Sequence, residues 1–152
     1  MTLEELEKRV RTLEDAEEIK TMHREYLFYI QNLEIDKALD CFTKNIVTDV
    51  ANYGIIKGKK EVGKFFREII RNNVLQSKDG HFTGQPVVSV EGNKAKGHWM
   101  FYRFLAGPSK KQWIQGRYDC EYVKENGAWK FSRMKFTAPW PEPDPRYEKG
   151  KF

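Results

Sequence analysis

Residues 80–105 read GHFTGQPVVSVEGNKAKGHWMFYRFL, and the rest of the chain is arranged around this stretch. It predicts two long strands joined by a tight turn at residues 91–93, because Glu-Gly-Asn separates two runs of strand-forming residues. Successive side chains of a strand point to opposite faces, so one face of the first strand carries a polar row. This row consists of His81, Thr83, Gln85 and Val87. A histidine, a hydroxyl and an amide inside a sheet indicate a lined cavity.

The second strand of this hairpin is predicted to be largely apolar on both faces. One face carries Trp99, Phe101, Arg103 and Leu105, and the other carries His98, Met100, Tyr102 and Phe104. Burying a guanidinium among such side chains is costly unless an anion meets it. We therefore expect Arg103 to contact either a protein carboxylate, such as Asp49 or Asp119, or an anionic group of a ligand.

Length and charge favour one domain with an acidic beginning. A chain of 152 residues with 39% hydrophobic residues can build a sizeable core, so we expect residues 1–152 to form a single domain. Residues 1–40 hold eleven acids against six bases, a net charge of −5, so the remaining residues carry +10 and the whole chain +5. The simplest interpretation is an acidic helix against a basic sheet or a neighbouring subunit. The basic, aromatic-rich remainder of the chain also suggests nucleic acid as a partner. The aromatic residues, however, alternate as expected for a core, so we expect no nucleic-acid partner.

Several classes of protein are not favoured by the sequence. The charged N-terminus has no apolar segment, so we expect a cytoplasmic protein with no membrane partner. Cys41 and Cys120 are too few for a disulfide framework and are predicted to be small core residues. No nucleotide-binding, nucleophile-elbow or metal-ligand motif occurs, so we expect neither a metal nor a cofactor. Any chemistry would depend on side chains around a cavity.

The first third of the chain is predicted to be helical. Thr2 and Glu5 have the spacing of a capping box. A narrow apolar stripe follows at Leu3, Leu6, Val10 and Leu13. We interpret residues 1–14 as a helical extension whose stripe is a seam for another subunit or for the barrel wall. A wider apolar face then marks the core helix, at Ile19, Met22, Tyr26, Tyr29, Ile30 and Leu33.

The remaining elements follow in a helix-then-strand order. We predict a short helix at 36–42, strands at 45–50 and 53–56, a helix at 61–70, and strands at 111–124 and 128–138 after the hairpin, with turns at 107–108 and 126–127. This order predicts an α+β domain in which a bent antiparallel sheet wraps the long helix. Every second residue from Pro139 to Pro145 is a proline, so residues 139–152 are predicted to run extended over the surface.

The three histidines have different expected roles. His23 lies in a charged helical turn and is expected at the surface, and His98 at a strand start is expected to be structural. His81 has polar neighbours on its face of a buried strand, so we predict a functional role for it. The alternative is a hydrogen-bonded core histidine.

The order and spacing of short pieces throughout the chain resemble a known family. These pieces are Ile19-Lys20 and Tyr26 in the entry helix, the segments 36–39 and 45–47, Gly58 before a helix, His81 five residues before Pro86, Gly97, and the segments 116–118 and 126–130. Together they resemble the SnoaL-like group of the nuclear-transport-factor-2-like superfamily, which includes scytalone dehydratase, bile-acid 7α-dehydratase, polyketide cyclases and a hexachlorocyclohexane dehydrochlorinase. The resemblance covers nearly the whole chain and implies a cone formed by a bent sheet around a long helix, with a pocket at its wide end.

The resemblance also implies roles for individual residues. His81 matches the family's catalytic histidine, and Tyr26 matches a pocket tyrosine of the bile-acid dehydratase. The chain departs from the family at four further positions, one of which is Ala138, near the place of a late-strand arginine. Gln31 stands where an aspartate usually holds the histidine, Arg103 where the dehydratases have an aspartate or histidine, and Val50 where they have a tyrosine. Gln31 can orient the imidazole without supplying charge, whereas a nearby Arg103 would lower the histidine pKa and keep the ring neutral.

From these residues we predict cofactor-independent acid–base chemistry. The expected reaction is elimination of water, or a related cyclisation or isomerisation, on a small cyclic or carbonyl-bearing substrate, with His81 as base and Tyr26 as hydrogen-bond donor. A carboxylate-bearing substrate is one candidate. The predicted binding residues are Ile30, Gln31, Val50, Thr83, Gln85, Phe101 and Arg103. We expect a homo-oligomer, a dimer or trimer, and the alternative function is a non-catalytic ligand-binding or scaffold protein.

Overall fold

A long helix opens the chain and organises the fold. The computed structural model describes residues 1–77, 80–106 and 111–141. Helix α1 (Leu3–Gln31) begins with the predicted capping box, in which Thr2 Oγ1 accepts from the Glu5 N–H at 3.1 Å and the Glu5 carboxylate accepts from the Thr2 N–H at 2.7 Å. The helix runs without a break through both predicted segments. All of its buried residues lie from Asp15 onward, and they are Asp15, Ile19, His23, Tyr26, Leu27 and Ile30.

A small helical layer and two strands follow α1. The elements are α2 (Ile35–Asp40), β1 (Phe42–Val50), β2 (Ile55–Lys57), α3 (Lys59–Phe65), a π-helical turn (Phe66–Ile70) and α4 (Arg71–Ser77). The predicted helix at 61–70 is therefore longer than expected, because the apolar stripe continues through Val74, which is buried. The strand predicted at 45–50 begins three residues earlier, at Phe42.

Four long strands complete the sheet. They are β3 (Gly80–Glu91), β4 (Lys94–Ala106), β5 (Lys111–Glu125) and β6 (Ala128–Thr137), and the strand order is β2-β1-β6-β5-β4-β3. Strands β3 to β6 form an antiparallel meander. Strand β1, however, pairs with β6 in parallel, so the expectation of a purely antiparallel sheet is wrong at this pair. The two strands are far apart in sequence, so no turn between them fixes their relative direction.

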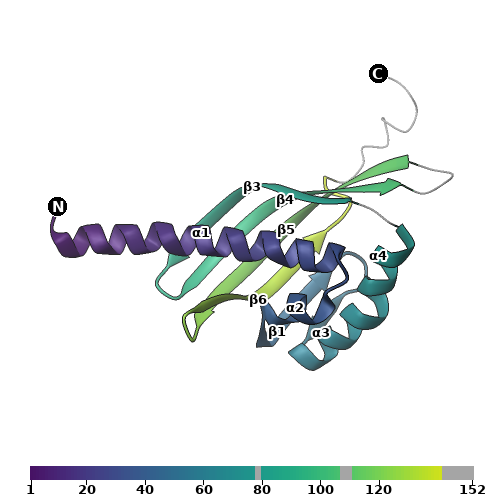
Figure 1. Ribbon diagram of the computed structural model, residues 1–152, viewed down its shortest axis with the longest axis horizontal. Coiled ribbons are helices and arrows are strands. Elements are labelled where there is room, and N and C mark those ends of the chain that lie inside the picture. The colour runs from purple at the N-terminus through teal and green to yellow at the C-terminus, as the bar shows by residue number, and fades with distance from the viewer. Residues whose placement is uncertain (78–79, 107–110, 142–152) are drawn as a thin grey trace, which may run out of the picture.

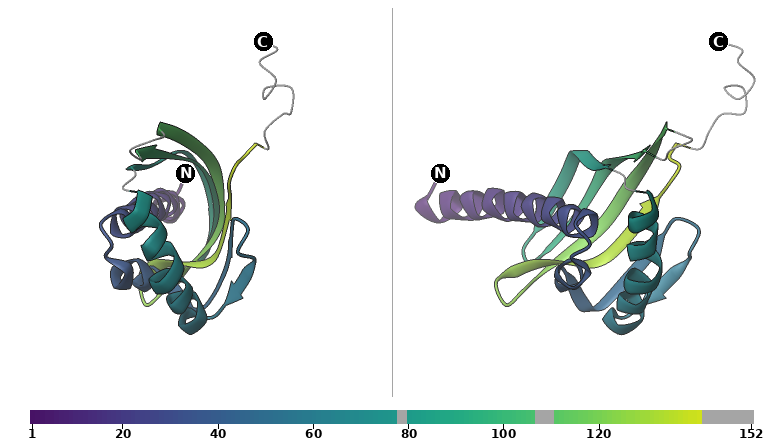
Figure 2. Two further views of the ribbon diagram at one scale, coloured as in Figure 1. Left: turned by 90° about the vertical axis from the view of Figure 1, so that its right-hand side faces the viewer. Right: turned by 45° about the vertical axis from the view of Figure 1, so that its right-hand side comes forward.

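The sheet curls around α1, as the left view of Figure 2 shows. The second half of α1 lies along the concave face, while α2, α3 and α4 gather beside the C-terminal end of that helix (Figure 1). Ile19 from the helix and Trp99, Phe131 and Met134 from the sheet are almost fully buried between these layers. The fold is α+β, as the order of predicted elements indicates.

A bulge in β3 changes which residues face inward. The register with β4 shifts between Gly84 and Val87, and Gln85 has a φ of 49°. Because the extra residue exchanges the two faces, His81 and Thr83 point inward before the bulge, whereas Val87 is exposed after it. The prediction that Gln85 and Val87 share the face of His81 is therefore wrong.

Side-chain burial corrects one histidine assignment. His23 is fully buried rather than at the surface, because it lies on the same face of α1 as Ile19 and Tyr26. Its charged neighbours in sequence, Arg24 and Glu25, are on the exposed side of the helix. His98 is exposed on the outer face of β4. Charged neighbours in the sequence of a helix therefore do not show whether a given residue faces the core.

The predictions about cysteines, turns and the tail have mixed outcomes. Cys120 is buried, as predicted, whereas Cys41 is only half-buried. Positive φ angles at Asn126 and Gly127, 51° and 77°, confirm the second hairpin turn. The turn predicted at 107–108 and residues 142–152 of the predicted tail lie outside the described residues. Within the described part of the chain, no helix combines the length and apolar character that a membrane crossing requires.

Candidate functional site

A cavity of about 760 Å³ lies between the concave face of the sheet, α1 and the layer of α3 and α4. Helix α1 contributes Tyr26, Leu27 and Ile30 to its wall. The π-helical turn and α4 contribute Phe66, Ile70, Asn73 and Val74, and the rest of the wall comes from the strands and from the segments that follow β1 and β6. A π-helical turn shifts the residues that follow it around the helix, and such turns are frequent at functional sites. An apolar cavity of this size with a few polar groups is typical of small-molecule sites.

Six predicted site residues line the cavity. They are Tyr26, Ile30, Val50, His81, Phe101 and Arg103. The other three lie outside its described wall. Gln31 is half-buried at the end of α1, and Gln85 is exposed at the bulge of β3. Thr83 faces inward, but its hydroxyl donates to the backbone carbonyl of Met100 at 2.9 Å.

His81 and Arg103 are the central polar pair of this cavity. They are directly opposite each other in the β3–β4 register, and cross-strand partners have Cβ atoms about 5 Å apart on the same face. The His81 ring meets the Phe101 ring edge-on, with centroids 5.5 Å apart. Arg103 Nη2 donates to the Asn73 carbonyl at 3.5 Å, which ties the guanidinium to α4.

The electrostatics of this pair place a neutral base beside a cation. Burial lowers the pKa of His81 to about 4, so the imidazole is neutral at pH 7. Burial also lowers the pKa of Arg103, but an arginine stays charged at neutral pH. The cavity can therefore remove a proton at one point and stabilise negative charge at the next.

Two tyrosines supply hydroxyl groups to the same cavity. Tyr26 is 3% exposed, and its hydroxyl donates to Met134 Sδ at 3.6 Å. The Tyr118 ring packs against Phe101 and Phe136, with centroid distances of 5.7 and 4.8 Å. Burial raises the pKa of both tyrosines well above the usual value. Both hydroxyls are therefore protonated at neutral pH and act as hydrogen-bond donors.

Several wall residues were not predicted as site residues. Tyr118 could have been identified, because it is the β5 partner of Trp99 and shares its inward face. Tyr53 and Asn73 come from the segment after β1 and from α4, and Asn73 Nδ2 donates to the Tyr53 hydroxyl at 3.1 Å. No local pattern in the sequence connects those two segments.

Two glycines make room for rings around the site. A Cβ on Gly116 would lie 2.9 Å from the Phe136 ring and from the Thr137 carbonyl, so only glycine lets that ring lie across β5. A Cβ on Gly97 would lie 3.1 Å from the Tyr122 ring and 3.3 Å from the Val87 carbonyl. Both glycines are among the residues that carry the family resemblance, Gly116 within the segment 116–118 and Gly97 as a single residue. The close approach of a ring and a carbonyl to each position explains why a glycine is needed there.

The chain segment after β6 forms part of the cavity rim. Residues 138–141 line the cavity. The Trp140 N–H donates to the Gln115 carbonyl at 3.0 Å, and Gln115 Nε2 donates back to the Trp140 carbonyl at 3.0 Å. The Arg117 guanidinium lies 5.2 Å from the Trp140 ring centroid. The first residues of the predicted tail are thus held against β5 at the rim.

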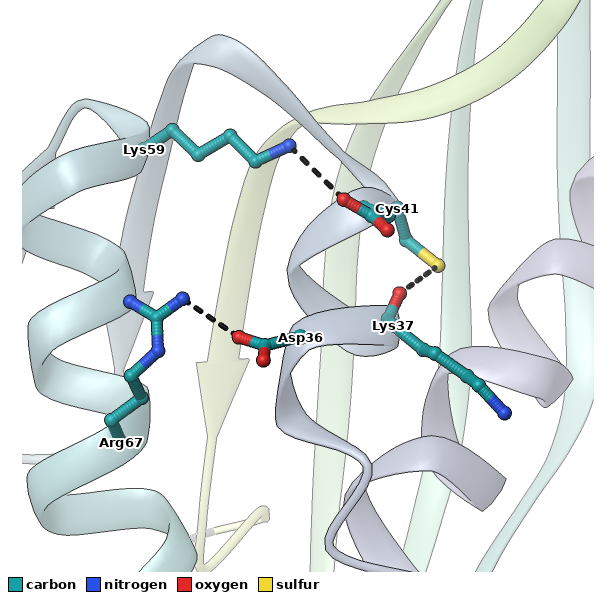
Figure 3. Close-up of polar contacts among 6 residues, drawn as sticks. Asp36, Lys37, Cys41, Lys59 and Arg67 are labelled. Carbon is teal, nitrogen blue, oxygen red and sulfur yellow. Dashed lines mark hydrogen bonds and ion pairs between the residues drawn. The ribbon is translucent and has the colours of Figure 1, made fainter.

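Two ion pairs connect α2 to the helical layer of the cavity. Arg67 Nη2 lies 2.8 Å from Asp36 Oδ1, and Lys59 Nζ lies 3.7 Å from Asp40 Oδ1 (Figure 3). All four groups are solvent-exposed, so each pair contributes at most about 1 kcal/mol. They join α2 to the π-helical turn and to α3 without stabilising the fold strongly. Among the described residues, no group of three His, Cys, Asp or Glu side chains could hold a metal ion.

Comparison with known proteins decides the family. Residues 11–135 match the model of the SnoaL-like domain, which is most of the chain. The protein belongs to the SnoaL-like family. This assignment confirms the resemblance found in the sequence. No curated protein matches the sequence of this SnoaL-like chain.

Solved structures share the fold of this SnoaL-like domain at low sequence identity. An NTF2-like protein with a cystatin-like fold from Novosphingobium aromaticivorans has a TM-score of 0.79 and 18% identity, over 99% of this chain and 98% of that one. A candidate scytalone dehydratase from the same organism has a TM-score of 0.72 and 15% identity, over 83% and 85% of the two chains. A hexachlorocyclohexane dehydrochlorinase from Novosphingobium barchaimii has a TM-score of 0.74 and 15% identity, over 87% and 91%. At these identities the likeness shows the fold alone.

Proposed function

We propose that this cavity binds a small cyclic or carbonyl-bearing molecule and catalyses its dehydration, or a related cyclisation or isomerisation, without a cofactor. The observation that carries the proposal is the pairing of His81 with Arg103 on the inner face of the β3–β4 hairpin, inside an apolar cavity. Two fold neighbours have names that describe eliminations, a dehydratase and a dehydrochlorinase. Their likeness supports the reaction class only as an analogy.

The proposed reaction needs only side chains. His81 takes the proton from a carbon next to the substrate carbonyl, and the electron pair of that C–H bond moves toward the carbonyl oxygen. Arg103 stabilises the negative charge that develops on this oxygen. A hydroxyl on the neighbouring carbon then leaves with the proton held by His81, so that a C=C bond and one water molecule form. In an isomerisation, the same proton returns to a different carbon.

The tyrosines complete this proposal as donors rather than as acids. Their pKa values are raised by burial, so the Tyr26 and Tyr118 hydroxyls do not lose protons at neutral pH. Each hydroxyl can orient a carbonyl or hydroxyl oxygen of the substrate. The aromatic walls from Phe101 and Phe136 exclude water, which strengthens every charge interaction inside the cavity.

A carboxylate-bearing substrate fits the same arrangement. The guanidinium fork of Arg103 can hold a carboxylate through two parallel hydrogen bonds. A bound carboxylate near the imidazole would also raise the pKa of His81 and make it a stronger base. We therefore expect Arg103→Met to weaken binding of an acid ligand by tenfold or more, in line with about 1.5–3 kcal/mol for a charged hydrogen bond. Binding of the neutral methyl ester should change little.

The outer face of the sheet provides a control for this experiment. Arg133 on β6 is exposed, so Arg133→Met removes the same charge from the molecule without touching the cavity. If both variants weaken the acid ligand equally, the effect is one of net charge, and Arg103 does not bind the carboxylate.

Catalysis itself is tested in two stages. A thermal-shift screen of hydroxylated aromatics, steroids and polyketide-like acids identifies ligands, because a bound ligand raises the apparent stability. Each ligand is then incubated with the wild-type protein and analysed by mass spectrometry for loss of water or for rearrangement. Conversion by the wild type and not by His81→Ala supports the proposal. Ligands that bind tightly and are recovered unchanged would instead indicate a binding protein.

A further inference from the structure

The first half of α1 projects beyond the ends of the strands (Figure 1). Every residue from 1 to 14 is exposed. Four of them form an apolar stripe, here called the N-terminal stripe, with exposed fractions of 73% for Leu3, 45% for Leu6, 45% for Val10 and 68% for Leu13. The family match begins at residue 11, so most of this stripe lies outside it.

The N-terminal stripe faces away from the sheet. With 3.6 residues per turn, its centre lies roughly 160° around the helix from the face that carries Ile19, His23 and Tyr26. On the opposite side of the same half-helix, Lys8, Arg11 and Thr12 line a groove together with both hairpin turns. The sheet of the same chain therefore cannot cover the stripe, and the side from which another molecule would approach it is open.

The spacing of the stripe is that of a coiled coil. Steps of three, four and three residues place Leu3 and Val10 at the a positions, and Leu6 and Leu13 at the d positions, of two heptads. We propose that the N-terminal stripe is the seam of a parallel two-stranded coiled coil with a second copy of this chain. A β-branched residue at a and leucine at d, as in the second heptad, favour two strands.

The charges beside the seam favour the parallel orientation. Arg9 occupies a g position, and Glu7 and Glu14 occupy e positions. In a parallel pair, Arg9 of each copy faces Glu14 of the other copy, so two attractive contacts form by symmetry. In an antiparallel pair, Arg9 would face Arg9 and Glu7 would face Glu7, and like charges oppose association.

The seam is short but its helix is already formed. Glu17 and Lys20 occupy the next a and d positions, so the apolar seam ends at Leu13. A helix of two heptads would be marginal by itself in water. Here the second half of α1 is packed into the core and holds the first half in helical conformation. Association therefore does not have to fold the helix, and a weak dimer that dissociates on dilution is expected.

Sedimentation of the full chain over a range of protein concentrations tests this proposal. The wild type should form a dimer at high concentration, and a double variant with Leu6→Gln and Leu13→Gln should be monomeric throughout. Glutamine keeps the helix, since its helix propensity is high. The control variant Lys8→Gln changes an exposed residue away from the seam and should behave as the wild type. A wild type that is monomeric at every concentration, or a double variant that still dimerises, would overturn the proposal.

A charge exchange tests the orientation. Arg9→Glu places two acidic residues against each other at both contacts and should weaken the dimer by about threefold to tenfold. Adding Glu14→Arg to this variant should restore the wild-type dissociation constant. Failure of the second change to restore association would overturn the parallel arrangement.

A vesicle experiment separates a protein partner from a lipid surface. Vesicles of mixed neutral and anionic lipids should leave the wild type in solution, since the proposed occupant of the stripe is another copy. Co-sedimentation with these vesicles that is lost in the Leu6→Gln, Leu13→Gln variant would show that the stripe covers lipid instead, and would overturn the proposal.

Discussion

Two histidines face the concave side of the sheet, a fully buried one in a sealed aromatic core and a half-buried one in an open cavity. His23 on α1 is surrounded by rings, with Trp99 at 4.4 Å and Tyr118 at 5.0 Å between centroids. His81 on β3 lies beside Arg103 and lines the cavity of about 760 Å³. Burial lowers the pKa of both rings, to about 3 for His23 and about 4 for His81. Burial therefore does not distinguish a functional histidine from a structural one.

Access separates the two rings. The Tyr122 hydroxyl accepts from Trp99 Nε1 at 3.1 Å and lies 2.9 Å from His23 Nδ1, so it can donate its proton to that nitrogen. This contact occupies Nδ1 of His23 inside the aromatic core. His81 instead lines a space that a ligand can enter. The comparison indicates that a lowered pKa supports a proposed base only where a cavity adjoins it.

The largest expected difference between the two regions is catalytic. His81→Ala should reduce turnover of a substrate by about 10²–10⁴-fold while the protein stays folded, because it removes the proposed base. The measurement is the steady-state rate at saturating substrate, together with a thermal unfolding curve. His98→Ala on the exposed outer face of β4 is the matched control and should leave the rate unchanged. Loss of folding without a separate kinetic defect would make His81 a core residue like His23.

The next largest effect is a loss of stability on replacing His23 in the sealed core. His23→Ala opens a space among aromatic rings and removes one of the two partners of the Tyr122 hydroxyl, at a cost of about 2–4 kcal/mol in the free energy of unfolding. Urea denaturation checks this value. Ligand affinity of the folded fraction should not change. A variant as stable as the wild type would mean that the hydrogen-bond chain contributes little.

The sequence predicts the parts of the structure that depend on local patterns and misses those that join distant segments. The capping box at Thr2, the turn at Asn126-Gly127 and the alternation within 80–105 are local signals, and they gave the correct elements. The position of His81 and Arg103 in the cavity wall could be predicted for the same reason, since a tight turn sets the register of a hairpin. The parallel pairing of β1 with β6 and the partnership of Tyr53 with Asn73 join distant segments, so no local pattern carries them. The bulge at Gln85 escaped prediction because one inserted residue leaves the composition of the strand unchanged.

Acid should weaken both regions in the same pH window. Each histidine binds a proton more readily in the unfolded chain, near pH 6.5, than in the folded one, at about pH 4 for His81 and about pH 3 for His23. Stability is therefore fully present above pH 6.5 and is lost as the pH falls, by about 1.4 kcal/mol per pH unit for each ring. Urea denaturation at successive pH values should show this slope, reduced in His23→Ala. A flat profile between pH 6.5 and pH 4 would argue against burial of both rings.

The smallest effect is expected where α1 meets the β5–β6 turn. Asp15 Oδ1 accepts from Lys124 Nζ and from Trp129 Nε1, both at 2.8 Å. Burial alone would raise the pKa of Asp15, but these two hydrogen bonds and the positive charges of Lys124 and Arg11 together outweigh it and lower the pKa. Asp15→Asn keeps an acceptor oxygen and loses the charge, so we expect a loss of about 1 kcal/mol. Glu17→Gln, in the exposed pair with Lys20, is the control and should change stability by less than about 0.5 kcal/mol.

The most direct test of the central claim is hydrogen exchange in a bound ligand. A ligand from the screen with a hydrogen next to its carbonyl is held at saturation in D₂O, and loss of its C–H signal is followed by NMR in wild type, His98→Ala and His81→Ala. The account predicts exchange in the first two proteins, constant near neutral pH and falling as the pH approaches about 4, where His81 becomes protonated. Exchange in His81→Ala should be slower by about 10²-fold or more. Equal exchange rates in wild type and His81→Ala, with the ligand bound in both, would contradict the assignment of His81 as the base.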